Sequence, residues 1–550
     1  MRTRQSLRPE PCAVTKSKPP GAAGWPTLAL ILGVQVFLLA WAAVANRHLL
    51  NTDAVAYLRL AEYYANGSLD LAVSGYWGPL LSWLVAGMMS LGVPALIAAR
   101  VVMAASALGF AGACHFLLSR LNIPGGLVRG GTALAALATV PWSVAQVSPD
   151  LLQGALALMA LGCVLSSRWP TSPQLAVASG FWWGLAYLGK AIALPWGAAT
   201  MVTVAAIRWF RIPAARRTVG VNGALALGSL LIVVLPWVVV LTLNYGRPTF
   251  STSARIAHAI AGPSEADRYH PFARTFHQPA VGRVTAWEDP SLMPYRHWSP
   301  WEGGEAFRHQ AQVCLANVKT IYQLVGSIDL MRLGWAGMLG GILFGGVAGS
   351  RGENQSWRWL AVPCAWLVLA YLPVAVGPRD ERYFFVAWPL LFGAFAGFAA
   401  ARRWLDSQQG WRRLVVIGAL AISFGGPALT ELPQSLVGRP DPASEVAWDL
   451  SGRMKRAGIE GSIAGSGLIA GGRAGLYLAY LDGRRWLGDQ PDAGAADYFD
   501  AASDLVVVNR RQPVRLELDR DSRFESLDPF LFARPDDPAA YPLKVFRIRR

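Results

Sequence analysis

Residues 46–81 of this chain read NRHLLNTDAVAYLRLAEYYANGSLDLAVSGYWGPLL, and they follow directly after its first long apolar run. The pattern predicts a helix from Asp53 to Ala65, with Asn51 or Thr52 placed to cap its start. This helix is too polar to cross a bilayer, so Asp53 lies at the end of the first membrane span. The organisation of the whole chain therefore depends on which side of the membrane this stretch faces.

The composition indicates a membrane protein. The 550 residues are 53% hydrophobic, which exceeds the usual content of a soluble protein. A membrane helix needs roughly 20 mainly apolar residues, and such runs recur between Trp25 and Pro433. The formal net charge of +16 comes from Lys and Arg that cluster in short links between these runs, as topology signals do. We therefore expect a polytopic α-helical protein that contacts membrane lipids and does not bind nucleic acid.

Basic segments set the predicted topology. The leader at residues 1–25 indicates a cytoplasmic N-terminus, and the first apolar run is too long for a cleaved signal peptide. With this first run, about eleven spans are expected, and the loop from Arg208 to Arg217 gives the strongest inside signal. Residues 78–91 are either a span or an interfacial helix; a span would turn the basic loops outward, so we interpret them as interfacial. We expect a multi-pass protein of the inner (plasma) membrane with Asp53 outside.

Three regions are predicted along the chain. They are a basic cytoplasmic N-terminus at 1–25, a transmembrane domain at 26–437 and a small extracytoplasmic α/β domain at 438–550. The transmembrane domain has a first outer loop at 46–97 and a long outer loop at 244–328, whose length and aromatic content favour a functional role. In the last region the patterns predict helices near 444–456 and 472–481 and strands at 461–465, 505–509 and 543–548.

Ionisable side chains recur at the outer ends of predicted spans. They are Asp53 after the first span, Asp150 after the third, Lys190 after the fifth and residues 379–382 after the ninth. Such groups are costly at membrane depth unless they are solvated or paired, so we expect them to share a polar pocket. A carboxylate there can take the proton of an acceptor hydroxyl, and Arg or Lys can neutralise a leaving phosphate. This chemistry suits transfer from a lipid-phosphate donor and needs no nucleotide.

Seven segments carry a resemblance to a known family. They are TDAVAYLRLAEYYANG, GYWGPLLSWL, AARVV, SPDLL, GLAYLGK, RDERYFFVAWPLL and GLYLAYLDGRRWLG. Their order resembles the GT-C class of membrane glycosyltransferases, close to the protein O-mannosyltransferases and the aminoarabinose and galacturonic acid transferases that modify lipid A. The resemblance covers nearly the whole chain. It implies a GT-C fold and transfer of a sugar from a polyprenyl-phosphate donor to a lipid, glycan or protein hydroxyl, with inversion at the anomeric carbon.

The resemblance also implies roles for individual residues. Asp53 is expected to be the catalytic residue, as base or acceptor orienter. The residues expected to hold the donor phosphate are Arg382, Lys190 and Arg255. Those expected to contact substrate are Tyr57, Asp150, Tyr383 and Arg379. Many relatives have an acidic pair where this chain has Asp53-Ala54, so we expect no metal and no other cofactor.

Plainer readings exist for the same features. Asp53 suits the positive end of a helix dipole, Asp150 is able to cap the next helix, and Lys190 is able to reach the membrane interface. The histidines of the long loop fit no compact zinc pattern. For the whole protein, the alternatives are a transporter or flippase of lipid-linked substrates, or a non-catalytic assembly partner with the same scaffold.

Overall fold

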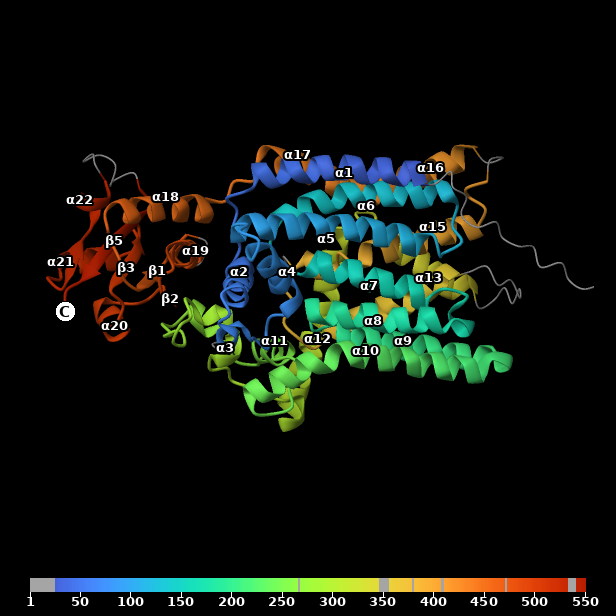
Figure 1. The fold of residues 1–550 in the computed structure, drawn as a ribbon, viewed down its shortest axis with the longest axis horizontal. Coiled ribbons are helices and arrows are strands. Elements are labelled where there is room, and N and C mark those ends of the chain that lie inside the picture. Colours follow the sequence, from blue (N-terminus) through green and yellow to red (C-terminus); the bar gives the residue numbers. More distant parts are fainter. Residues whose placement is uncertain are drawn as a thin grey trace, which may run out of the picture.

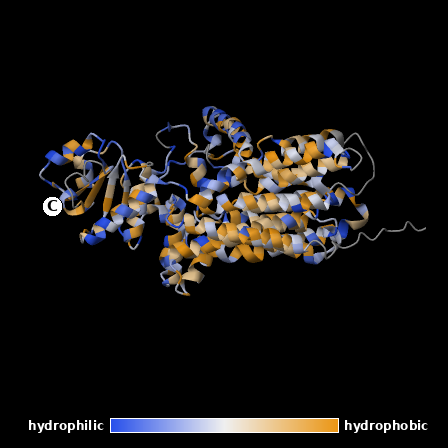
Figure 2. Ribbon diagram, turned by 90° about the horizontal axis from the view of Figure 1, so that it is seen from above, coloured by the Kyte–Doolittle hydropathy of each residue, from blue (hydrophilic) through white to orange (hydrophobic). Residues whose placement is uncertain are grey.

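The computed structural model combines a bundle of long helices with a β-sheet unit at one end (Figure 1). It describes residues 25–265, 268–345, 356–377, 380–406, 410–469, 472–532 and 541–550. Hydrophobic residues cover the bundle helices, whereas the sheet unit mixes hydrophilic and hydrophobic residues (Figure 2). The two parts therefore differ in composition as the sequence indicates.

The helices of the bundle follow the predicted spans. They are α1 (Trp25–Ala45), α5 (Ala95–Leu118), α6 (Gly125–Ala145), α7 (Asp150–Val164), α8 (Pro173–Gly189), α9 (Ala193–Arg211), α10 (Arg216–Tyr245), α13 (Leu333–Gly345), α14 (Ala361–Tyr371), α15 (Ala387–Ala401), α16 (Gly410–Leu420) and α17 (Gly426–Val437). Within the described ranges, four helical stretches are long and apolar enough to cross a membrane: Trp25–Ala45, Ala95–Leu118, Pro213–Tyr245 and Gly410–Arg456. The count of about eleven spans stays a prediction.

Small residues allow close packing between bundle helices, as is common in membrane proteins. A Cβ atom at Gly180 of α8 would lie 1.9 Å from the carbonyl oxygen of Ala226 on α10. One turn further along α8, a Cβ at Gly184 would lie 2.6 Å from the Cβ of Val233. The backbones of α8 and α10 are therefore too close for any side chain at Gly180.

Four short helices and the 23-residue α12 lie at the end of the bundle that carries Asp53. They are α2 (Thr52–Ala65), α3 (Leu69–Ala72), α4 (Pro79–Met89), α11 (Ser253–Ala259) and α12 (Gly304–Gly326). The 3₁₀ turns of the chain include Trp169–Thr171, Pro213–Ala215, Pro271–Ala273, Ala286–Glu288, Pro290–Leu292, Pro300–Glu302, Ser356–Leu360 and η10 (Glu381–Phe384). With 11 residues, α4 is about 16 Å long, roughly half the hydrocarbon core. Its interfacial position stays a prediction.

The C-terminal unit contains a five-stranded mixed sheet. Its strands are β1 (Ile463–Ser466), β2 (Trp486–Asp489), β3 (Leu505–Asn509), β4 (Phe524–Ser526) and β5 (Leu543–Ile548), in the order β2-β1-β3-β5-β4. β1 is parallel to β2 and β3, whereas β5 is antiparallel to β3 and β4. The helices are α18 (Pro442–Arg456), α19 (Arg473–Asp482), α20 (Ala495–Asp500), α21 (Val514–Arg520) and α22 (Asp528–Leu531).

The long outer loop joins the sheet unit to the bundle. Its Val284 carbonyl accepts a hydrogen bond from the N–H of Trp486 on β2 at 2.7 Å. The same loop buries Glu288, whose carboxylate accepts a hydrogen bond from the Tyr63 hydroxyl of α2 at 2.8 Å. From the sheet unit, the Tyr480 hydroxyl of α19 donates to Glu62 of α2 at 3.3 Å. Helix α2 is therefore held by the long loop and by the sheet unit.

Replacing Gly180 tests the close approach of α8 and α10. We expect Gly180→Val to lower the free energy of unfolding by about 1–3 kcal/mol or more, because its side chain meets backbone atoms that cannot move aside. The matched control is Gly228→Ala on α10, where nothing lies within 4 Å of the added Cβ. Thermal unfolding in detergent measures both variants. Equal melting temperatures for the two would contradict this packing.

Candidate functional site

The position of Asp53 is fixed by hydrogen bonds between two segments that connect bundle helices. Asn51 stands at the N-cap of α2, but its side chain makes no capping hydrogen bond. Instead, its Oδ1 accepts from the N–H of Val147 at 2.8 Å and its Nδ2 donates to the carbonyl of the same residue at 3.3 Å. This pairing brings the start of α2 to the link between α6 and α7, so that Asp53 and Asp150 lie in one place.

Arg382 of η10 lies between the two carboxylates. Its Nη1 is 2.6 Å from Oδ2 of Asp53 and 2.7 Å from Oε1 of Gln146, and its Nε is 3.8 Å from Oδ2 of Asp150. Lys190, which follows α8, places its Nζ 2.6 Å from Oδ1 of Asp150. We call Asp53, Asp150, Lys190 and Arg382 the charged cluster. With two cations and two carboxylates, it is electrically balanced.

Aromatic rings lie beneath the two cations. Lys190 Nζ is 3.6 Å from the ring centroid of Tyr383, and the Arg382 guanidinium carbon is 5.3 Å from it. The Tyr383 ring stacks on Tyr371 with centroids 5.4 Å apart and an angle of 6°. A cation over a ring face is stabilised by the ring quadrupole. Tyr383 therefore helps to hold both cations beside the carboxylates.

Burial and neighbouring charges shift the pKa of groups in this region. Burial lowers the pKa of Lys190, and the charge of Arg382 adds to this effect while Asp150 opposes it. Burial raises the pKa of the Tyr57 hydroxyl, and the negative charges of Asp53 and Asp150 raise it further. The Tyr57 hydroxyl therefore stays protonated and is able to donate a hydrogen bond at neutral pH.

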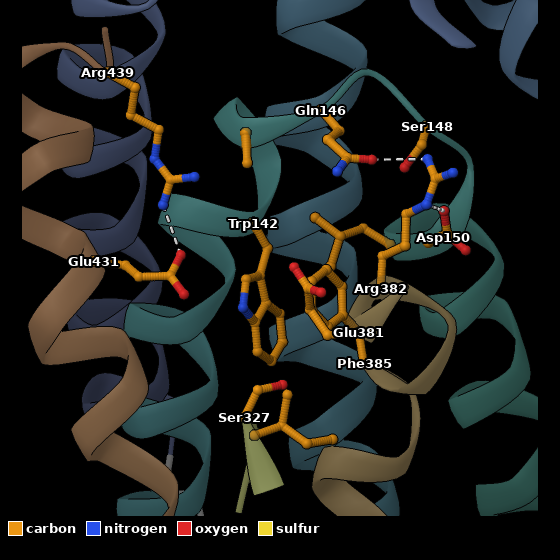
Figure 3. A pocket seen from close by; sticks show the side chains of 13 residues that line it. Trp142, Gln146, Ser148, Asp150, Ser327, Glu381, Arg382, Phe385, Glu431 and Arg439 are labelled. Atoms are coloured by element: carbon orange, nitrogen blue, oxygen red, sulfur yellow. Dashed lines mark hydrogen bonds and ion pairs between the residues drawn. The ribbon is translucent and has the colours of Figure 1, made fainter. Parts of the chain in front are cut away.

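A cavity of about 90 Å³ is lined by Arg382 together with its partners Gln146 and Asp150 (Figure 3). Its labelled lining residues are Trp142, Gln146, Ser148, Asp150, Ser327, Glu381, Arg382, Phe385, Glu431 and Arg439. Trp142 and Phe385 stack with centroids 3.9 Å apart, and Arg439 pairs with Glu431 at 2.6 Å. The cavity thus offers flat apolar surface next to the guanidinium of Arg382.

Six of the predicted site residues come together in the structure: Asp53, Tyr57, Asp150, Lys190, Arg382 and Tyr383. Arg255 does not join them. Arg255 is exposed on α11, and its charge adds to the effect of burial that lowers the pKa of His297. No hydrogen bond or ion pair between described residues links it to the charged cluster. Arg379 lies outside the described residues. Their roles in substrate binding stay predictions.

Sequence reasoning missed the role of Gln146 in this region, and it missed that Glu381, one of the predicted ionisable residues at 379–382, lies near Glu431. Gln146, which bonds Arg382, is the first residue after α6, and a polar side chain at a helix end next to Asp150 was a usable signal. Glu381 lines the cavity beside Glu431, whose charge adds to the upward effect of burial on the pKa of Glu381. Nothing in the sequence indicates this contact, because the two residues are 50 positions apart.

Comparisons with known proteins place the fold. By sequence, the chain matches no family model and no curated protein. By structure, it is similar to ArnT from Cupriavidus metallidurans bound to undecaprenyl phosphate, with a TM-score of 0.53, 15% identity, and 96% of this chain and 98% of that chain covered. The apo form of that ArnT gives a TM-score of 0.54 at the same identity and coverage.

A third similar structure is the arabinofuranosyltransferase AftD from Mycobacteria. Its TM-score is 0.51 at 15% identity, and the likeness covers 96% of this chain but 40% of AftD. The chain therefore has the fold of these proteins from end to end, and the resemblance to the GT-C class that the sequence indicates is confirmed at the level of the fold.

A double-mutant cycle tests the contact between Arg382 and Asp53. We expect Arg382→Gln and Asp53→Asn to show an interaction energy of about 1 kcal/mol or more, because both side chains are largely buried and each single change leaves a charge unpaired. Unfolding in detergent gives the four free energies. The control cycle uses the exposed pair Arg523→Gln and Asp521→Asn, for which we expect additivity. Additive effects at Arg382 and Asp53 would contradict the close contact.

Proposed function

We propose that this chain is a membrane glycosyltransferase that moves a sugar from a polyprenyl-phosphate donor to a hydroxyl group of a lipid, glycan or protein acceptor. The observation that carries the proposal is the contact of Arg382 with both Asp53 and Asp150. It places a cation suited to phosphate against a carboxylate suited to deprotonate an alcohol. The fold agrees, since ArnT was solved with undecaprenyl phosphate and AftD is an arabinofuranosyltransferase.

In the proposed reaction the acceptor oxygen attacks the anomeric carbon of the donor sugar. The bond between that carbon and the phosphate oxygen breaks, and the polyprenyl phosphate leaves with the electron pair. Asp53 takes the hydroxyl proton, while Arg382 and Lys190 neutralise the departing phosphate. Because the displacement is direct, the anomeric configuration inverts. In this scheme Tyr57, Asp150 and Tyr383 contact or position the substrates, and Arg379 and Arg255 stay as predicted contacts outside the charged cluster.

The balanced charges of the cluster support this assignment. In the structure Arg382 pairs with Asp53 at 2.6 Å and Lys190 pairs with Asp150 at 2.6 Å. An arriving phosphate competes for both cations, and a cation that turns towards the phosphate frees its carboxylate. Binding of the donor then activates Asp53 as a base. The guanidinium also fills the place between the carboxylates, which is the reason that we propose a reaction without a metal.

We also propose that the charged cluster faces the outside of the inner membrane. Basic loops support this orientation, because Arg120 in the link at 119–124, Arg168 in the link at 165–172 and the four arginines from Arg208 to Arg217 lie at the helix ends opposite to the Asp53 end. In this orientation the first outer loop, the long loop and the sheet unit are all extracytoplasmic. A lipid-linked donor suits that side, since nucleotide sugars are made and used in the cytoplasm.

Transfer of labelled sugar from a polyprenyl-phosphate donor in isolated membranes tests the function. We expect wild type to transfer label to endogenous acceptors and Asp53→Asn, expressed at an equal level, to be slower by about 10²–10⁴-fold because it lacks the base. The matched control is Asp70→Asn, which changes an exposed acid of the same outer loop. A chelator should leave the wild-type rate unchanged.

Three outcomes would contradict the proposal. Equal transfer by wild type and Asp53→Asn would remove Asp53 from the mechanism. Transport of the lipid-linked sugar across proteoliposomes without transfer would favour a flippase. Neither activity in wild type would favour a non-catalytic assembly partner.

A further inference from the structure

Aromatic side chains from two outer loops pack together beside the charged cluster. Trp287 is at the centre, with its ring centroid 4.7 Å from His270, 4.9 Å from Phe272, 5.2 Å from Trp77 and 5.7 Å from Tyr76. The Trp77 indole also donates a hydrogen bond to the Trp287 carbonyl at 2.9 Å. We call the following group the aromatic wall: Tyr76, Trp77, His270, Phe272, Trp287 and Tyr295.

The aromatic wall lies next to the charged cluster, because the ring centroid of Trp77 is 5.1 Å from that of Tyr57, one turn after Asp53 on α2. Burial raises the pKa of the Tyr76 hydroxyl and lowers the pKa of His270 to about 4, and the charge of Asp53 exerts an upward effect on both. The positive charge of Arg382 has the opposite, downward effect on the pKa of Tyr76. Trp77 and Trp287 are buried, whereas Tyr76 and His270 are only half-buried. Tyr76 and His270 are therefore the two of these four residues that keep some exposed surface.

His270 is held in one orientation and keeps one nitrogen available. Its Nδ1 is 2.9 Å from the Tyr295 hydroxyl, and its ring lies edge-on to Trp287 at an angle of 78°. No hydrogen bond to its Nε2 is found among the described residues. A neutral imidazole has one donor and one acceptor nitrogen. Nε2 is therefore able to form a hydrogen bond with a hydroxyl group of a ligand.

The carboxylates next to the wall already have partners. Glu288 accepts a hydrogen bond from the Tyr63 hydroxyl at 2.8 Å and lies close to Arg59, at 3.7 Å. Asp289 accepts hydrogen bonds from the Tyr245 hydroxyl at 2.8 Å and from the Ser74 hydroxyl at 3.3 Å. These two acids are buried and used within the protein. The wall thus presents ring faces, a phenol and a neutral imidazole, and neither acid is available to pair with an amine.

Packing alone does not account for this group. Elsewhere in the long loop, His258 stacks on Trp298 with centroids 4.4 Å apart and bonds Gln310 at 2.8 Å, which suffices to fix local structure. His270 differs because it is half-buried, the charge of Asp53 acts to raise its pKa, and no hydrogen bond among the described residues uses its Nε2. Ring faces combined with uncharged hydrogen-bonding groups are well suited to a sugar, whose C–H face packs on rings and whose hydroxyls need partners.

We propose that Tyr76, His270 and Tyr295 form the subsite for the sugar carried by the donor, and that this sugar is uncharged. His270 is a positioning residue that bonds a sugar hydroxyl, while Tyr76 packs against the sugar ring. This inference rests on the proposed function for the identity of the donor. It adds that the wall, and not the charged cluster, distinguishes one donor sugar from another.

The test compares binding of undecaprenyl phosphate with binding of its sugar-bearing forms to the purified protein in nanodiscs. The sugar-bearing probes carry an uncharged pentose, an uncharged hexose, an amino sugar or a uronic acid. We expect wild type to bind at least one uncharged form more tightly than bare undecaprenyl phosphate. His270→Ala should weaken that form by roughly three- to tenfold, as expected for one hydrogen bond, and leave bare undecaprenyl phosphate unchanged.

Control variants separate this role from a structural one. His258→Ala removes a stacked, hydrogen-bonded histidine from the same loop and should leave the ratio of the two affinities unchanged. His270→Gln should restore part of the sugar-dependent affinity, because the amide is able to replace the hydrogen bond. Equal weakening of both ligands in His270→Ala, or no weakening of either, would overturn the inference. So would a wild-type preference for the amino sugar or the uronic acid. Sugar-dependent binding without any transfer would support the subsite and refute the proposed enzyme activity.

Discussion

The ion pair between Arg382 and Asp53, 2.6 Å long, is the contact on which the proposed site depends. Asp53 begins a helix after the first span, and Arg382 precedes the helix α15, more than 300 residues later. Neither group is stable alone at the membrane boundary, because an unpaired charge there has lost much of its hydration. The pair therefore holds together distant parts of the chain, and any substrate that separates the two charges must supply a replacement for one of them.

A phosphate is able to replace Asp53 as the partner of Arg382. The ion pair that stabilises the site is thus the same interaction that the proposed chemistry uses. Lys190 and Asp150 repeat the same arrangement next to the first pair. The surrounding outer elements then fix the pairs in space, since the Asn51 side chain ties the start of α2 to the α6–α7 link. The long loop and the sheet unit hold the other face of α2 through Tyr63 and Tyr480. Rigid placement of this kind favours positioning of a reacting group.

The sequence allows much of this arrangement to be predicted, for identifiable reasons. Apolar runs mark the bundle helices, and the strands β3 and β5 are found at their predicted residues because both are continuous apolar or alternating stretches. The strands β2 and β4 are not predicted from the sequence, because they have only four and three residues and include Gly, Asp or Glu. The sequence shows which charged residues lie at span ends, but it does not show which residues they bond. The hydrogen bonds of Asn51 with Val147 and of Arg382 with Gln146 depend on tertiary packing. The same limit applies to Arg255, because its place in the long loop does not indicate how far it lies from the charged cluster.

The most direct measurement of the central claim is a cryo-electron microscopy structure of the protein with undecaprenyl phosphate in nanodiscs. The account predicts phosphate density within hydrogen-bonding distance of Arg382 or Lys190, together with a lengthened contact between Arg382 and Asp53. Phosphate density elsewhere on the protein, with the charged cluster unchanged, would contradict the claim that these cations receive the leaving group.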